Sequence, residues 1–276
     1  MLECLLDALI DTIKLIPYLL ITFLLLEWME HKLSKKTEKV ITKYKKLGPL
    51  LGGIFGGFPQ CGFSAMGANL YTSGIITRGT LIAIFLSTSD EMLPIMISEQ
   101  VSIPVMLEIV GFKIIIGILI GFIVDLLLKN KFERTIGEIC DEEHCHCKNG
   151  IIKSSLIHTL KTTGFILLAN VLIGVAIYFI GTENLENLLK SNNLFVYFLS
   201  SLIGLIPNCA ASVVITELYL SNFIPIGVAI AGLLTSSGIG ILLLFKNNKY
   251  LKDNLLVLSI IYTTGVIVGF IIDCFL

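Results

Sequence analysis

A proline, an amide, a thiol and several hydroxyls stand together inside an apolar tract, in the stretch FPQCGFSAMGANLYTSG at residues 58–74. Residues 206–222, IPNCAASVVITELYLSN, repeat this arrangement at a constant shift of 148. Thiolates suit soft or borderline metal ions, and oxygen ligands suit harder ones. The duplication favours a substrate site, although the prolines could be packing kinks and each cysteine a small buried hydrophobe. The candidate ligands are Cys61, Cys209, Gln60, Asn208, Ser64, Ser212, Asn69 and Glu217, with Pro59 and Pro207 as helix breaks.

Carboxylates inside apolar surroundings give a second group of candidates. Asp90 and Glu91 lie in LSTSDEMLP, and Glu217 lies in VVITELYL. Ionisable side chains are costly in a membrane and usually line a pathway, so we predict that these three bind the substrate or couple its transport. An interfacial helix end is the alternative for Asp90 and Glu91. Five other charged residues are predicted to snorkel to the interface or to lie at helix ends, namely Lys14, Lys113, Lys161, Asp125 and Asp273. Glu108 and Lys113 are a candidate structural pair.

The tract CDEEHCHC at residues 140–147 gathers thiols and imidazoles in one loop. Such ligands suit Zn, Cu or Co, although the spacing is not that of a standard zinc finger. A solvated loop without a fixed role is the alternative. The other cysteines are scattered, so we expect free thiols and not a disulfide framework. The predicted metal ligands of this tract are Cys140, His144, Cys145, His146 and Cys147.

The composition predicts the element that must carry these residues. Hydrophobic residues make up 55% of the chain, charged residues make up 15%, and the mean hydropathy is +0.88. Apolar stretches of about 20 residues recur, which is the length that a helix needs to cross a bilayer. The first stretch lacks the basic head and cleavage site of a signal peptide, so we interpret it as a span. We therefore predict an all-α, multi-pass integral protein of the cell membrane, in contact with lipid.

The chain is predicted to be a duplication. Its domains would be a first membrane repeat at 1–128, a cytoplasmic His/Cys-rich linker at 129–155 and a second membrane repeat at 156–276. Each half has a first span, an amphipathic segment, a Pro-broken segment, a third segment and a last span. The third segments are placed at 75–98 and 223–245. About ten helical membrane segments result.

Loop charges indicate that the two repeats have inverted topology. The loop at 31–46 is strongly basic, whereas its counterpart at 181–193 is not. Later in each repeat the order reverses, because the loop at 246–252 carries three lysines and its counterpart at 98–104 carries none. Cytoplasmic loops collect Lys and Arg, so the two repeats should face opposite ways. Inverted-repeat transporters form their substrate site from discontinuous helices near the midplane.

With these features in view, the chain resembles the ten-transmembrane heavy-metal exporters, labelled arsenic efflux proteins or manganese transporters, within the wider arsenic permease group. The resemblance is most specific at residues 56–94 and 204–222. It implies export of a metal or metalloid ion. Related permeases carry closely paired cysteines, whereas here each copy has one, followed by Gly62 or Ala210. The thiols would suit arsenite, and the carboxylates and amides would suit manganese.

We therefore predict a secondary transporter, or permease, that exports a heavy-metal or metalloid ion and is not an enzyme. No phosphate-binding loop is present, so ATP hydrolysis would need another subunit. We expect no resident cofactor and no nucleic-acid partner, and a homo-oligomer is left open. The alternatives are an ion channel or an intramembrane thiol-dependent enzyme. The enzyme lacks a C-x-x-C pair, and a serine protease based on GFSAMG lacks an evident partner for Ser64, because His158 lies at a helix entrance.

Inverted topology predicts opposite labelling of two equivalent loops. Cysteines introduced at Val40 and at Leu188 should react with a membrane-impermeant thiol reagent from opposite sides of the membrane, because one loop is cytoplasmic and the other is not. Labelling in everted and in right-side-out vesicles measures this. Reaction of both positions from the same side would contradict the inverted arrangement.

Overall fold

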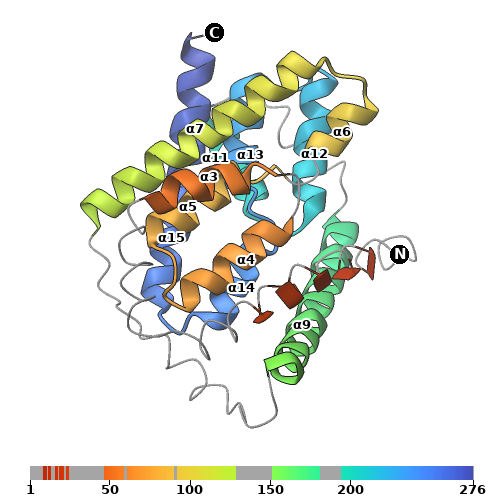
Figure 1. The fold of residues 1–276 in the computed structure, drawn as a ribbon. Coiled ribbons are helices and arrows are strands. Elements are labelled where there is room, and N and C mark those ends of the chain that lie inside the picture. The colour runs from red at the N-terminus through yellow and green to blue at the C-terminus, as the bar shows by residue number, and fades with distance from the viewer. Residues whose placement is uncertain are drawn as a thin grey trace.

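The computed structural model describes residues 9–10, 12–13, 16–17, 19–21, 23–24, 47–58, 61–89, 92–128, 151–180 and 194–275 of the chain. These residues form helices and no strands (Figure 1). The principal helices are, in chain order, α3 (Gly48–Gly56), α4 (Cys61–Thr72), α5 (Arg78–Ser87), α6 (Met92–Ser98), α7 (Ile103–Leu127), α9 (Ile151–Ile180), α11 (Phe195–Gly204), α12 (Cys209–Leu220), α13 (Ile226–Thr235), α14 (Gly240–Asn247) and α15 (Leu251–Phe275).

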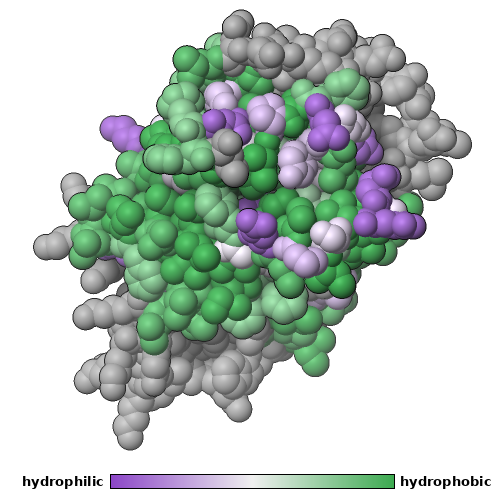
Figure 2. Space-filling model, turned by 90° about the horizontal axis from the view of Figure 1, so that it is seen from above, coloured by the Kyte–Doolittle hydropathy of each residue, from purple (hydrophilic) through white to green (hydrophobic). Residues whose placement is uncertain are grey.

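Four stretches of the described chain are long and apolar enough to cross a membrane, as the composition predicts. Two of them, α7 and α15, have 25 residues each and are mostly exposed. The other two are α5 with α6 and α13 with α14, and these are mostly buried inside the protein. The face of the molecule seen in Figure 2 is largely hydrophobic, with hydrophilic residues in separate groups. An apolar exterior of this kind suits contact with lipid.

The second half of the chain repeats the helix bounds of the first half. Adding 148 to the bounds of α4, α5 and α7 gives the bounds of α12, α13 and α15. In the first half, the middle helix α5 packs against α3 and against the last helix, α7. In the second half, the middle helix α13 packs against α11 and against the last helix, α15. Each half is therefore a small bundle with its most buried helix in the middle.

Equivalent glycines allow the middle and last helices to cross closely. A Cβ atom added at Gly79 would lie 2.1 Å from the carbonyl oxygen of Gly121, and one at Gly227 would lie 2.2 Å from that of Gly269. Backbone cannot move aside as a flexible side chain can. Glycine is therefore required at both crossings, in the same register.

An aspartate at the end of each last helix binds the start of the middle helix. Asp125 Oδ1 accepts a hydrogen bond of 2.8 Å from Gly79 N–H, and Asp273 Oδ1 accepts one of 2.8 Å from Gly227 N–H. Their second oxygens accept from Thr77 Oγ1 and Tyr197 OH. A carboxylate is favourable at a helix N-terminus. Both are helix-end charges by position, as predicted, but they bond to a neighbouring helix and do not snorkel.

The two halves interlock. Helix α4 of the first half packs against α14 of the second, and α12 of the second packs against α6 of the first. Figure 1 shows α4 beside α14, and α12 beside α6. At the first of these contacts a Cβ added at Gly240 would lie 2.9 Å from Ser64 Cβ. The contact between halves thus includes one of the predicted site residues.

The third segment of each half is broken into two helices, a feature that the sequence analysis did not predict. Helix α5 ends at Ser87 and α6 begins at Met92, while α13 ends at Thr235 and α14 begins at Gly240. Hydroxyl side chains compete with the helical backbone for hydrogen bonds. Gly238, in the second break, has a φ of 53°, which glycine adopts without strain. Runs of Ser and Thr were the sequence feature that marked these breaks.

Several predicted boundaries cannot be compared with the structure. The loops at 31–46 and 181–193, and the linker as far as residue 150, lie outside the described residues. Helix α9 begins at Ile151, which is inside the range predicted as linker. The division into 1–128, 129–155 and 156–276 stays a prediction.

The close crossing predicts a specific sensitivity to one methyl group. Gly79→Ala should lower the free energy of unfolding by about 1–3 kcal/mol, because the added Cβ meets backbone. Gly111→Ala is the matched control, since a Cβ there meets nothing within 4 Å, and it should be neutral or slightly stabilising. Thermal unfolding in detergent measures both. Equal midpoints for the two variants would show that the helices do not cross as described.

Candidate functional site

Buried hydroxyl groups occupy the break in the middle helix of each half. Three residues with hydroxyl groups lie at each break, and all six are at most 4% exposed, although the bundle around them is apolar. A Cβ at Gly56 would lie 2.1 Å from Ser87 Oγ, and one at Gly204 would lie 2.3 Å from Thr235 Oγ1. The first helix of each bundle therefore covers its break. The six residues are Ser87, Thr88 and Ser89 in the first half and Thr235, Ser236 and Ser237 in the second.

Most of these hydroxyls bond to backbone carbonyls nearby. Ser87 Oγ–H donates to Ala83 O at 2.7 Å, and Thr88 Oγ1–H donates to Ile84 O at 2.7 Å. Ser237 Oγ differs, because no partner for it exists among the described residues. A buried hydroxyl without a partner is costly. The second break therefore retains a polar atom that can still bind a water molecule or an ion.

A buried lysine lies against the first break. Lys113, on α7, is 1% exposed, and its ammonium donates to the carbonyl oxygen of Thr88. Glu108 is exposed. The prediction that Lys113 snorkels is wrong, because its charge is held inside the bundle at the carboxyl end of α5, where the helix dipole favours a cation. Ile261 stands at the equivalent position in the second half and is fully buried.

Ser64 and Asn69 are buried at the contact between the halves, and Ser212, the counterpart of Ser64, is buried on α12. Ser64 and Ser212 occupy equivalent positions on α4 and α12 and are at most 2% exposed. Asn69 is also 2% exposed, and its Oδ1 accepts a hydrogen bond of 2.8 Å from Asn247 Nδ2. The Nδ2 atom of Asn69 has no partner among the described residues. Polar groups from both halves thus meet around α4.

Glu217 lies elsewhere than the sequence suggested. It is exposed on α12, whereas Ser212 and Thr216 of the same helix are buried. Because Cys209 begins α12, the two residues stand about two turns apart. In this structure Glu217 therefore lies on an exposed surface of α12.

The other predicted ligands are described only in part. Cys61 and Cys209 each begin a helix, but the description does not extend to their side chains. Pro207 and Asn208 lie in the bend between α11 and α12 and are partly buried. In the described parts of the chain, no three His, Cys, Asp or Glu residues gather to hold a metal ion. Residues outside the description are Pro59, Gln60, Asp90, Glu91 and the tract Cys140, His144, Cys145, His146 and Cys147.

Sequence reasoning missed a buried polar network between the halves. Arg78 begins α5, and Asp253 lies in the first turn of α15, 175 positions away. Arg78 Nη2 lies 2.5 Å from Asp253 Oδ1, and Tyr71 OH donates to Asp253 Oδ2 at 2.6 Å. The only sequence feature that could have found this pair is a charge of each sign beside an apolar span.

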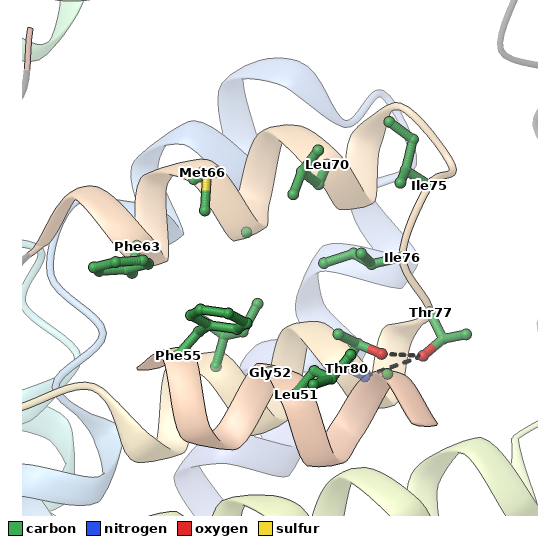
Figure 3. A pocket seen from close by; sticks show the side chains of 13 residues that line it. Leu51, Gly52, Phe55, Phe63, Met66, Leu70, Ile75, Ile76, Thr77 and Thr80 are labelled. Atoms are coloured by element: carbon green, nitrogen blue, oxygen red, sulfur yellow. Dashed lines mark hydrogen bonds between the residues drawn. The ribbon is translucent and has the colours of Figure 1, made fainter. Parts of the chain in front are cut away.

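A separate pocket of about 340 Å³ lies beside α3, α4 and the start of α5 (Figure 3). Leu51 and Phe55 enter it from α3, and Phe63 and Met66 enter it from α4. Its polar side chains are Thr77 and Thr80, whose hydroxyls bond to each other at 2.7 Å. None of the predicted ligands lines it. Its apolar lining is unsuited to an ion.

Comparison with known protein families finds one family that matches the chain. Residues 1–182 match a family described as "Putative, 10TM heavy-metal exporter". The chain belongs to this family. The match covers the first bundle and α9, and the helices after it repeat the bounds of the first half. No curated protein and no solved structure matches the chain.

Removal of the buried charge of Lys113 should destabilise the protein more than removal of an exposed lysine charge. Lys113→Met should lower the free energy of unfolding by about 1–3 kcal/mol, because the Thr88 carbonyl loses its buried donor. Lys161→Met is the control, since Lys161 is exposed on α9, and it should change stability by less than about 0.5 kcal/mol. Thermal unfolding of both variants is the measurement. A harmless Lys113→Met would contradict the buried position of the ammonium.

Proposed function

We propose that this protein is a secondary transporter that carries a heavy-metal or metalloid ion out of the cell, across the cell membrane. Its family is one of heavy-metal exporters, and its helices are suited to a membrane. The observation that carries the proposal is the pair of buried helix breaks, placed equivalently in the two halves and rich in hydroxyls. Irregular backbone at membrane depth is tolerated where it is buried in protein or lines a cavity.

The interlocked halves support an inverted repeat. Helix α4 packs against α14, and the equivalent helices α12 and α6 also pack together, which is the exchange expected for two copies related by a two-fold axis. The loop charges indicate that this axis lies in the membrane plane. In such transporters the substrate binds between the copies, and rocking of one copy against the other exposes the site to each side in turn.

The proposed ligands come from both copies. Cys61 and Cys209 begin equivalent helices, and a helix N-terminus attracts an anion or a thiolate. Ser64 and Ser212 follow on the same helices. A thiophilic ion such as arsenite would use the thiols, and a harder ion such as manganese would use the oxygen atoms of Asn208, Asp90 and Glu91. The tract at 140–147 would serve as an accessory metal-capturing segment on the cytoplasmic side.

Coupling to protons belongs to the same proposal. A carboxylate that exchanges a proton for a metal ion would drive export with the proton gradient. Asp90 and Glu91 directly follow the buried hydroxyls of the first break, which places them in sequence at the proposed site. Glu217, which is exposed in this structure, would take part only in a state that brings α12 closer to α6.

Ion flux in everted vesicles tests the proposed function. Vesicles containing the protein should accumulate one metal or metalloid of a panel that includes manganese and arsenite, and dissipation of the proton gradient should reduce this accumulation. Flux that follows only the ion's own gradient would indicate a channel. No flux of any ion in folded protein would contradict the transporter.

Substitution of the paired cysteines tests the proposed ligands. Cys61→Ser together with Cys209→Ser should lower the initial rate of export at least about tenfold, because the thiolates are lost from both copies. Cys274→Ser is the matched control, since Cys274 is an exposed free thiol at the end of α15, and it should leave the rate unchanged. Full export by the double variant would show that these cysteines are packing residues.

A further inference from the structure

The two ends of the proposed pathway differ, although the two halves are equivalent in sequence position. At one end, the loop after α4 approaches the loop between α14 and α15. At the other end, the equivalent segments are the loop after α12 and the loop between α6 and α7. The first end is buried and hydrogen-bonded, and the second is exposed. The difference is visible residue by residue at positions 148 apart.

The buried end is held by an ion pair between the halves. Arg78 donates to Asp253 Oδ1 from both Nε, at 2.9 Å, and Nη2, at 2.5 Å. The two side chains are 8% and 3% exposed. Separation of such a pair leaves an uncompensated buried charge unless both groups reach water. The pair therefore favours a single arrangement of the two halves.

Neighbouring side chains extend this contact across the same end. Tyr71 OH donates to Asp253 Oδ2 at 2.6 Å, and Asn248 Nδ2 donates to the same oxygen at 2.9 Å. Asn247 Nδ2 donates to Asn69 Oδ1 at 2.8 Å. Every one of these bonds except that of Asn248 joins a residue of the first half to one of the second. Both oxygens of the carboxylate are thereby occupied.

The opposite end holds different residues at the equivalent positions. Ile226 and Val105 stand where Arg78 and Asp253 form the pair, so no ion pair can form there. Glu217 and Glu99 stand where Asn69 and Asn247 bond, and both glutamates are exposed. Two carboxylates brought together would repel, whereas the two amides attract.

Burial of equivalent serines follows the same division. Ser73 is 4% exposed at the end held by the ion pair. Ser221, its counterpart, is exposed. The two serines occupy equivalent positions just after α4 and α12. Their difference in exposure therefore results from the packing around each end and not from the residue type. One end is therefore buried and the other is exposed in the part of the chain that the structure describes.

We propose that Arg78 and Asp253 form a latch that closes one end of the transport pathway, and that the structure is the state closed at this end and open at the Glu217 end. The inference rests on the proposed transporter function. The loop at 246–252 is predicted to be cytoplasmic, so the closed end faces the cytoplasm. Uptake of an ion from the cytoplasm then requires that the pair separates and that the opposite end closes.

Thiol labelling of the two serine positions tests the latch. Ser73→Cys and Ser221→Cys are made separately, and reaction with a membrane-impermeant maleimide is quantified on the peptide that carries each position, in everted and right-side-out vesicles. In the otherwise unaltered chain, position 221 should react at least about tenfold faster than position 73. Arg78→Gln should speed reaction at position 73 at least about fivefold, from the cytoplasmic side, and slow reaction at position 221.

Three further variants make the test independent of lost stability. Arg78→Asp combined with Asp253→Arg restores a pair of opposite charges and should return position 73 to slow labelling. Tyr71→Phe removes only one hydrogen bond to Asp253 and should shift labelling in the direction of Arg78→Gln by a smaller factor. Ile226→Arg combined with Val105→Asp should install a pair at the open end and slow reaction at position 221.

Equal labelling of the two serine positions, or no change at position 73 in both Arg78→Gln and Tyr71→Phe, would overturn the latch. These outcomes are separate from those of the flux measurement. A shift in labelling in a protein that exports no ion would show that the Arg78–Asp253 pair closes this end of the molecule, but would contradict the transporter. Export with unchanged labelling would do the reverse.

Discussion

Backbone polar groups that leave a helix within a bilayer need partners in the protein, because lipid offers none. This constraint explains the most unusual feature of the chain, which is that its two most buried membrane segments are also its broken ones. At each break the freed groups are surrounded by hydroxyls from the same segment and by a close helix of the same half. Lys113 supplies a further donor at the first break. The interlock of α4 with α14 and of α12 with α6 involves the helix that follows each break.

Close packing of the helices around the breaks depends on glycines at the helix crossings and on charged groups that have partners. The glycine crossings bring the last helix of each half close to the middle one, so that an aspartate at its end reaches the amide at the start of that helix. The same two interactions occur at equivalent positions in both halves. The halves differ where they meet, because only one end carries the Arg78–Asp253 pair. The contacts within the two bundles are equivalent, whereas the contacts between the bundles differ at the two ends. This combination suits two rigid bodies that rock against each other.

The sequence predicted the helical membrane class and the family, because apolar spans and duplicated motifs are local patterns that need no tertiary contact. It also marked Ser64 and Asn69, which are buried where the halves meet, and Ser212, which is buried on α12. It failed for Lys113 and did not foresee the breaks in the third segments, since burial of a lysine and interruption of an apolar helix depend on what packs against them. The pairing of Arg78 with Asp253 joins positions 175 apart and follows only from the fold. Glu217 looked buried because its neighbours in sequence are apolar, yet its side of α12 is exposed.

The interlock of the halves is tested most directly by disulfide crosslinking of Asn69→Cys to two alternative partner positions. Asn69→Cys with Asn247→Cys joins α4 to the end of α14, where the native amides bond at 2.8 Å. Asn69→Cys with Glu99→Cys replaces the second position by its counterpart, which directly follows α6, the helix that packs against α12. Mild oxidation in membranes should crosslink most of the first pair and little of the second. Equal yields for the two pairs, or a higher yield for the second, would contradict the exchange of helices between the halves.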